Sequence, residues 1–318
     1  MAARVIIDTD PGVDDAMAIA FARFSPQIDL LGLTTIYGNV SASQATHNAL
    51  ALLELLNYDI PVAKGAEVPF EKPLKDFPDF VHGKNGFGDI AIPEPSNSAV
   101  LQSADEFLID QVMSDPGQIT VIAIGPLTNV ALAIKKEPAF LKNLKQLVVM
   151  GGAVTINGNV NPAAEANMLS DPHAADFVLT REGPITLLGL DVSQQVIMSE
   201  HYLKEVHNSQ YLAGQFLFDM ARFYLNFHRS TGVDGLYTHD PSAIALVIDP
   251  SLFELEYGEI RVVTEGIAMG QTIMNRSGKL LGKTAWSNLP KIGVCMRVNS
   301  QGLLELYRNT FLESRLMS

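Results

Sequence analysis

Four carboxylates lie within eight residues near the start of the chain, in the segment Asp8-Thr9-Asp10-Pro11-Gly12-Val13-Asp14-Asp15. The segment follows a short apolar run and precedes a helical pattern, so we expect it at the edge of a sheet where open α/β proteins bind ligands. Asp10 before Pro11 suits a helix N-cap, but each helix-end interaction contributes only about 0.3–1 kcal/mol. Four like charges in one turn therefore indicate a bound cation, and ligands that are all oxygens favour Ca²⁺ or Mg²⁺.

A second acidic element, Thr238-His239-Asp240-Pro241, also has the Asp-Pro pattern of a helix start. Two such starts can place their carboxylates on one metal ion. A third pair, Asp171-Pro172, has no acidic companions, and we predict that Asp171 is only a helix cap. The first segment is not an EF-hand, because Gly12 falls at the fifth loop position and Ile19 replaces the bidentate Glu.

Short β-branched runs alternate with helical patterns over the first two thirds of the chain, which predicts an α/β fold with a doubly wound, mostly parallel sheet. The predicted strands are Arg4–Asp8, Leu31–Tyr37, Ile119–Ile124, Gln146–Met150 and Ile185–Leu190. The predicted helices are Asp14–Phe24, Ser43–Leu56, Ala104–Met113, Asn129–Lys136 and Pro172–Thr180. With no repeat and no low-complexity tract, residues 1–318 are predicted to form a single domain.

The remaining segments are less regular. Residues 70–98 are rich in Pro, Gly and Asp and include His82, and we expect them to form a lid over the substrate. Residues Ser199–His228 are predicted to be helical, with an aromatic stripe that includes Phe223, Tyr224 and Phe227. The runs Glu259–Thr264 and Lys291–Val298 are predicted strands, and a last helix is expected from Gly302 to about Leu312.

The composition and net charge limit the classes of molecule that the chain can bind. The chain has 318 residues, is 47% hydrophobic and carries a net charge of −13, so it can bury a large core and is not suited to bind nucleic acid or an anionic membrane. The single Cys295 cannot form an internal disulfide and is expected in the core. No apolar run approaches the ~20 residues of a membrane helix, and no leader pattern precedes Val5, so we expect a cytoplasmic protein.

Together these segments resemble the inosine-uridine nucleoside hydrolase family, whose members carry an Asp-Thr-Asp-Pro-Gly-x-Asp-Asp segment near the N-terminus. Further landmarks occur in the family's order: Gly38-Asn39-Val40, Ile124-Gly125-Pro126-Leu127-Thr128-Asn129, Val149-Met150-Gly151-Gly152, Asn159 with Glu165-Ala166-Asn167, and His239-Asp240-Pro241. The resemblance implies hydrolysis of the N-glycosidic bond of ribonucleosides and a homodimer or homotetramer. It also implies Ca²⁺ bound by Asp10, both oxygens of Asp15, the backbone carbonyl of Ile124 and Asp240.

Cleavage of an N-ribosidic bond passes through an oxocarbenium-like sugar, so an enzyme must hold the ribose, activate water and assist the departing base. By resemblance, Asp10 is the general base. His239 is the candidate to protonate or hydrogen-bond the departing base, because imidazole titrates near neutral pH. The expected substrate-binding residues are Asp14, Asn39, His82, Met150, Asn159, Glu165, Asn167 and His228. Glu165 and Asn167 are two residues apart and are predicted to face the same way on an extended segment.

One position departs from the family pattern. Ala166 stands where purine-handling members have an aromatic residue, so their base preference does not transfer to this chain.

Two other functions fit the acidic segment. A phosphohydrolase of the haloacid dehalogenase kind also places Asp-x-Asp after its first strand, but it needs a lysine that is missing near Asp8–Asp15. The other is a nucleoside-binding protein without turnover, which the presence of both Asp10 and His239 disfavours.

Overall fold

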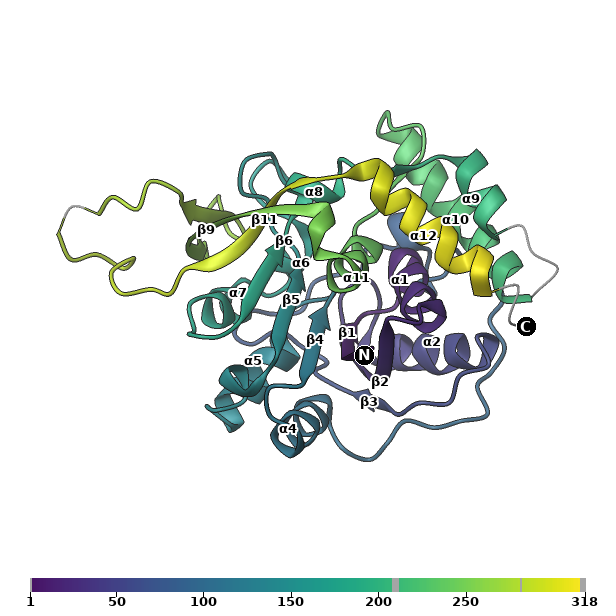
Figure 1. Ribbon diagram of the computed structural model, residues 1–318, viewed down its shortest axis with the longest axis horizontal. Coiled ribbons are helices and arrows are strands. Elements are labelled where there is room, and N and C mark those ends of the chain that lie inside the picture. Colours follow the sequence, from purple (N-terminus) through teal and green to yellow (C-terminus); the bar gives the residue numbers. More distant parts are fainter. Residues whose placement is uncertain (1, 208–211, 281, 315–318) are drawn as a thin grey trace.

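Nine strands form one sheet in the order β10-β9-β11-β6-β5-β4-β1-β2-β3 (Figure 1). The computed structural model describes residues 2–207, 212–280 and 282–314. The strands of this sheet are β1 (Ala3–Thr9), β2 (Ile28–Thr35), β3 (Val62–Lys64), β4 (Ile119–Ala123), β5 (Gln146–Met150), β6 (Ile185–Leu188), β9 (Phe253–Val262), β10 (Thr272–Asn275) and β11 (Ile292–Val298). Two short strands, β7 (Ile197–Met198) and β8 (Leu236–Tyr237), pair separately.

Most of the sheet is parallel, as predicted. From β11 across to β3 each neighbouring pair runs in parallel, whereas β9 is antiparallel to both β10 and β11. The predicted strand Leu31–Tyr37 is displaced, because β2 spans Ile28–Thr35, and Glu259–Thr264 covers only the end of the ten-residue β9. The sequence prediction missed β3 and β10, which contain three and four residues.

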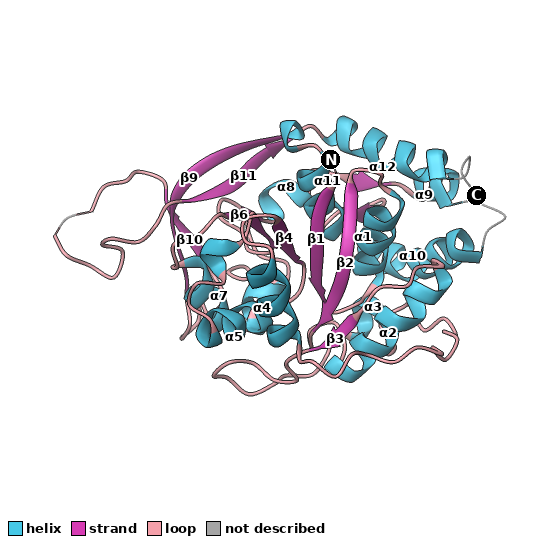
Figure 2. Cartoon of the chain, turned by 60° about the horizontal axis from the view of Figure 1, so that its bottom comes forward, coloured by secondary structure: helices cyan, strands magenta, loops and turns pink. Residues whose placement is uncertain are grey.

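Consecutive residues of the central strands pack into two different cores. Val5 and Ile7 of β1 belong to one hydrophobic cluster and Ile6 to the other, as the alternation of side chains along a strand requires. Both faces of these strands are therefore apolar, which is typical of a parallel sheet covered by helices. The first core is covered by α1 (Val13–Phe24), α2 (Ala42–Leu55), α10 (Leu212–Ser230), α11 (Asp240–Ile248) and α12 (Ser300–Ser314), and the second by α4 (Ala104–Ser114), α5 (Thr128–Lys136) and α7 (Pro172–Leu179) (Figure 2).

The remaining helices are shorter: α3 (Asp79–His82), α6 (Ala166–Ser170), α8 (Leu190–Ser193), α9 (Glu200–His207), and the 3₁₀ turns Leu141–Asn143 and Pro250–Leu252. The region Ser199–His228, predicted to be helical, contains α9 and most of α10, and residues 208–211 between them lie outside the described residues. Cys295 is fully buried, as expected. In the part of the chain that is described, no helix is long and apolar enough to cross a membrane.

The strand order places the acidic segment at the point where the sheet changes direction. From the central strand β1 the chain first adds β2 and β3 on one side, and then β4, β5 and β6 on the other. The loops that follow β1 and β4 therefore diverge and leave a crevice at the carboxyl ends of the strands, where doubly wound folds bind ligands. Helix α11 packs against α1 beside this crevice, which brings residues near position 240 to residues near position 14.

Candidate active site

A pocket of about 610 Å³ opens at this edge of the sheet. Its lining includes all the site residues expected from the sequence except Asp15: Asp10, Asp14, Asn39, His82, Ile124, Met150, Asn159, Glu165, Asn167, His228, His239 and Asp240. A volume of several hundred Å³ is typical of small-molecule sites. The structure therefore brings residues from positions 10 to 240 around one space large enough for a nucleoside.

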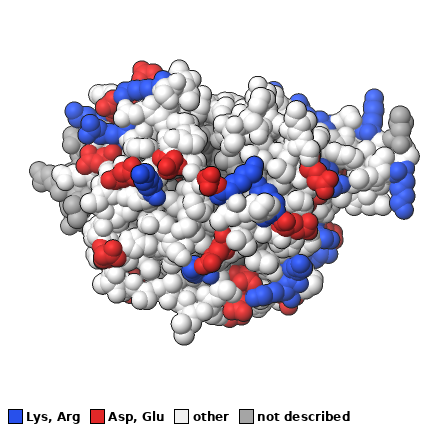
Figure 3. All heavy atoms as spheres, turned by 180° about the vertical axis from the view of Figure 1, so that it is seen from behind, with Lys and Arg blue, Asp and Glu red and all other residues white. Residues whose placement is uncertain are grey.

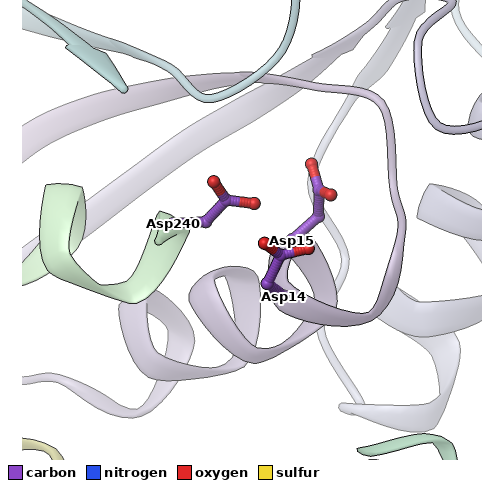
Figure 4. A group of neighbouring side chains, drawn as sticks. All are labelled: Asp14, Asp15 and Asp240. Atoms are coloured by element: carbon purple, nitrogen blue, oxygen red, sulfur yellow. The ribbon is translucent and has the colours of Figure 1, made fainter. Parts of the chain in front are cut away.

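Three buried carboxylates meet beside the pocket, and two of them, Asp14 and Asp240, line it. Asp14, Asp15 and Asp240 each offer an oxygen, and these oxygens lie within 4.8 Å of one another. Figure 4 shows that Asp14 and Asp15 come from the first turn of α1, and that the side chain of Asp240 reaches toward them from the start of α11. This cluster includes Asp14, which the sequence assigned to substrate rather than metal, and does not include Asp10.

The carboxylate of Asp15 organises the turn between β1 and α1. It accepts hydrogen bonds from the Thr9 hydroxyl at 2.6 Å, from the backbone N–H of Gly12 at 3.0 Å and from Nδ2 of Asn39 at 3.0 Å. The N-cap of α1 is Gly12, so Asp10 does not cap this helix. Asp10 is thereby free of a role at the helix end.

Asp10 is 2% exposed and is held by one of its two oxygens. Oδ2 accepts a 2.6 Å hydrogen bond from the backbone N–H of Asn39, whereas Oδ1 is buried and accepts none from the described residues. Gly38 and Gly125 flank this carboxylate, and a Cβ at either position would collide with it. Asp14 Oδ1 is likewise buried without a donor. Such unsatisfied anionic oxygens beside the carboxylate cluster fit a bound cation.

Burial raises the pKa of every carboxyl group in this turn. Desolvation raises the pKa of Asp8 to about 7, that of Asp14 to about 6, and those of Asp10 and Asp240 well above 3.8. The neighbouring carboxylates, first Asp15 for Asp10 and first Asp14 for Asp240, raise these pKa values further. A divalent cation reverses both effects, since it removes the cost of burying like charges.

Amide and carboxyl groups form the opposite side of the pocket. Nδ2 of Asn167 donates to the carbonyl oxygen of Ile124 at 2.8 Å and to that of Met150 at 3.1 Å. Glu165 is the N-cap of α6 and accepts from three backbone N–H groups, and Oδ1 of Asn159 accepts from Ala166 N–H. The prediction that Glu165 and Asn167 lie on an extended segment is wrong, because both are at a helix start; the turn nevertheless presents both to the pocket.

Three histidines line the pocket. Nδ1 of His239 lies 2.8 Å from the Ser193 hydroxyl, and Nδ1 of His82 accepts from the backbone N–H of Val13 at 3.2 Å. His82 also stacks on Tyr224, with ring centroids 5.1 Å apart. Nδ1 of His228 lies 3.0 Å from the carbonyl oxygen of Tyr224. Desolvation lowers the pKa of His82 to about 4 and that of His239 to about 3, so both rings are neutral near pH 7. This differs from the expectation that His239 titrates near neutral pH, and its cause is the burial of the ring.

Sequence reasoning missed several pocket residues. They include Tyr37, Gln194, Thr231 and Tyr237. Tyr37 follows the same strand as Asn39, so its place in the loop after β2 was a signal that could have identified it. The expected lid is partly at the pocket: residues up to His82 line it, whereas Ser96 and Asn97 bind Glu54 on the surface.

Two aspartates outside the cluster have roles that the sequence did not indicate. Asp8, in the core beneath the pocket, accepts from Thr34 at 2.6 Å and from Asn129 at 2.7 Å. Asp171 caps α7 as predicted, but it also binds the backbone of Phe70 and the hydroxyl of Thr128. The prediction that Asp171 is only a cap is therefore wrong.

A carboxylate cluster at the switch point of a doubly wound sheet, beside a pocket lined by polar and apolar side chains, fits an enzyme with a metal site. Comparisons with known proteins agree. Uridine nucleosidase 1 of Arabidopsis thaliana is 43% identical over 317 residues, which cover 99% of this chain and 93% of the relative. A solved plant nucleoside hydrolase, PpNRh1, superposes with a TM-score of 0.95 at 40% identity, covering 98% of this chain and 99% of that one. The structure of a purine-preferring ribonucleoside hydrolase from Gardnerella vaginalis superposes with a TM-score of 0.91 at 34% identity. The match covers 99% of this chain and 100% of that one.

The model of the inosine-uridine preferring nucleoside hydrolase family matches residues 5–305, and the chain belongs to this family. It is thus an N-glycosyl hydrolase of ribonucleosides, as the resemblance implied. The family excludes the phosphohydrolase alternative. On the face drawn in Figure 3, Lys and Arg side chains lie among Asp and Glu side chains.

Proposed function

We propose that this enzyme hydrolyses ribonucleosides, uridine among them, with Ca²⁺ held by Asp10, Asp15, Asp240 and the carbonyl oxygen of Ile124. The observation that carries the proposal is the meeting of Asp240 with Asp14 and Asp15 within 4.8 Å, beside the unpaired Oδ1 of Asp10. All these groups are hard oxygen ligands, which Ca²⁺ prefers. The names of the relatives support uridine as a substrate.

A cation bound by these residues would neutralise the buried carboxylates and would supply the positive charge that lowers the pKa of a bound water. Asp10 then serves as the general base. Its Oδ2 is fixed by the Asn39 N–H at 2.6 Å, and its free Oδ1 is available to accept the proton of the attacking water. Because burial raises the pKa of Asp10, its carboxylate has a stronger affinity for a proton than an exposed one.

The ribose is bound by groups that can accept and donate hydrogen bonds. Asp14, Asn39, Asn159, Glu165 and Asn167 all line the pocket, and Met150 supplies an apolar wall. Most of these side chains are already fixed by the protein, as Asn167 is by Ile124 and Met150. Preorganised side chains lose little conformational entropy on binding and so favour the reactive sugar geometry.

His239 is proposed to donate a hydrogen bond from Nε2 to the departing base, because burial lowers the pKa of His239 to about 3 and leaves the ring neutral. Its Nδ1 is engaged by Ser193, so the other nitrogen is the one available to the substrate. His82 and His228, which also line the pocket, are the alternative proton donors. Residues 69–82 are proposed as the lid that covers bound substrate.

A turnover panel tests the function. The purified enzyme is assayed with uridine, cytidine, inosine, adenosine and ribosylnicotinamide, with Ca²⁺ and after chelation, and reducing sugar and free base are measured. We expect Ca²⁺-dependent release of both from uridine in equal amounts. Ribose binding without base release would instead indicate the binding protein without turnover. Inorganic phosphate release from a generic phosphoester serves as the negative control.

We further propose that the enzyme acts in the cytoplasm as a homodimer or homotetramer. The composition supports a cytoplasmic protein, with a single buried cysteine and no disulfide. Light scattering coupled to size exclusion gives the oligomeric state directly, and a monomer at micromolar concentration would refute that part of the proposal.

A further inference from the structure

We propose that Asp171 is a positioning residue that fixes the wall of the substrate pocket. The pocket wall is defined here as residues 69–82, of which Pro69, Lys72, Leu74, Lys75, Asp76, Phe77, Pro78, Phe80, Val81 and His82 line the pocket. This inference rests on the proposal that the ribonucleoside binds in that pocket. Asp171 does not line the pocket and acts only through the residues it holds.

Asp171 is fully buried, and both of its carboxylate oxygens are used. Oδ1 accepts from the backbone N–H of Ala174 at 3.0 Å, which is the N-cap bond of α7. Oδ2 accepts two further hydrogen bonds, from the backbone N–H of Phe70 at 2.7 Å and from the Thr128 hydroxyl at 2.7 Å. A single side chain thus joins a helix start to a segment 101 residues earlier in the sequence.

The bond to Phe70 anchors one end of the pocket wall. The other end is anchored at His82, whose Nδ1 accepts from the backbone N–H of Val13. Between these anchors the backbone hydrogen bonds are local, such as the one from Asp79 N–H to the carbonyl oxygen of Phe77. The Lys72 ammonium donates to the carbonyl oxygen of Leu169. The position of the wall over the pocket therefore depends on its two ends, together with side-chain contacts such as those of Lys72 with Leu169 and of Phe80 with Phe227.

Through its hydrogen bond with Thr128, Asp171 also helps to position Tyr37 on a second side of the pocket. The Thr128 hydroxyl has one proton, which it donates to Asp171, so it must accept from the Tyr37 hydroxyl at 3.0 Å. The side chain of Tyr37 lines the pocket and is 2% exposed. One carboxylate therefore sets the position of two pocket elements that lie far apart in the sequence.

The chemistry of the site requires a carboxylate rather than an amide. Asn is as good an N-cap as Asp, because one acceptor oxygen is sufficient for that role. At this position, however, three donors converge on two oxygens. An amide that keeps the cap would direct its NH₂ group at the N–H of Phe70, and an amide flipped the other way would lose the cap.

The test compares Asp171→Asn with the parent and with Asp249→Asn in the full-length, Ca²⁺-loaded enzyme. Asp249 is a matched control, since it also precedes a proline and caps a short helical turn, and its carboxylate binds only Ser251 among the described residues. A second variant, Asp171→Ser, keeps a cap but is too short to reach Phe70. Steady-state kinetics with uridine and hydrogen exchange of the peptide covering residues 66–78 are measured for each.

We expect Asp171→Asn and Asp171→Ser to raise KM about tenfold or more, with kcat changed less than about threefold, because a loosened wall lowers the fraction of enzyme competent to bind. Exchange of the 66–78 peptide should accelerate in both, and Asp249→Asn should match the parent. Unchanged KM and exchange in both Asp171 variants, or a fall in kcat alone, would overturn the proposal. If uridine is not a substrate at all, the proposed function fails, while the exchange data still decide the role of Asp171.

Discussion

The hydroxyl of Ser193 lies 2.8 Å from Nδ1 of His239, and both side chains are buried. If the hydroxyl donates to Nδ1, the neutral imidazole carries its proton on Nε2, the nitrogen left for the substrate. A hydroxyl from one short helix, α8, thus selects the tautomer of a histidine at the start of another, α11. In that tautomer His239 has a defined direction for donating a hydrogen bond to the substrate.

The first prediction is that the contribution of His239 to kcat depends on the leaving group. A purine leaves poorly unless a ring nitrogen is protonated, uracil spreads negative charge over two carbonyls, and a nitrophenolate needs no proton. His239→Ala should therefore lower kcat most for inosine, less for uridine and least for a nitrophenyl riboside, with kcat/KM falling in parallel. Ser193→Ala should show the same ranking with smaller losses. Equal losses on all three substrates would show that His239 only positions its neighbours, and the search for the acid would move to His82 and His228.

The second prediction concerns Asp10 as the general base. Asp10→Asn keeps the size of the side chain but removes the proton acceptor and one charged metal ligand. General-base catalysis contributes about 10²–10⁴-fold, so kcat should fall by at least that range. Single-turnover kinetics at saturating Ca²⁺ separate the loss of chemistry from the loss of metal. Activity that stays within about tenfold of the parent would refute the role.

The third prediction concerns the metal. Removing metal by exhaustive chelation should abolish turnover, and Ca²⁺ should restore it better than Zn²⁺, because the proposed ligands are all oxygens. Asp240→Ala should lower Ca²⁺ affinity, measured by calorimetry, far more than it lowers the stability of the metal-free protein. Asp240 is the first residue of α11 and has no capping bond of its own, since His239 occupies the N-cap. Chelated enzyme with full activity would refute the metal site.

The fourth prediction is that stabilisation by Ca²⁺ grows with pH. In the metal-free protein burial raises the pKa of Asp8 to about 7 and that of Asp14 to about 6, whereas in the unfolded chain both groups lose their protons near pH 4. Between these pH values the folded state binds more protons, so its free energy of unfolding falls as pH rises.

Calcium binds the deprotonated carboxylates and compensates for this loss. The increase in Tm caused by saturating Ca²⁺ should therefore be larger at pH 7.5 than at pH 5.5. Thermal unfolding of metal-free and Ca²⁺-loaded protein at both pH values measures the difference. If Ca²⁺ raised Tm equally at the two pH values, the predicted protonation of Asp8 and Asp14 in the metal-free protein would be contradicted.

The fold was predictable to the extent that its signal is local. Strands such as β1 and β5 are continuous apolar runs, and helices such as α1 and α7 follow turn and cap residues, so their positions could be read from the sequence. The short strands β3 and β10 could not, because three or four residues are too few for a period and their pairing depends on a neighbour far along the chain.

The site was predictable where a side chain itself carries the chemistry. Asp14, Asp15 and Asp240 stand out as charged residues at helix starts, and the structure places one oxygen of each within 4.8 Å of the others. The carbonyl of Ile124 leaves no mark on residue identity, and it was named only through the family resemblance. The additional roles of Asp171 depend on contacts with Phe70 and Thr128, which local sequence does not reveal.

The packing of α11 on α1 has a consequence for how the protein is made. Asp14 and Asp15 leave the ribosome early, whereas Asp240 follows more than two hundred residues later. Until the later helix docks, the N-terminal carboxylates have only part of their ligand set and repel one another. The complete set of ligands forms only when α11 has packed against α1, so the ion is expected to bind tightly only to the folded protein. Metal binding can therefore serve as a measure of the formation of the tertiary structure.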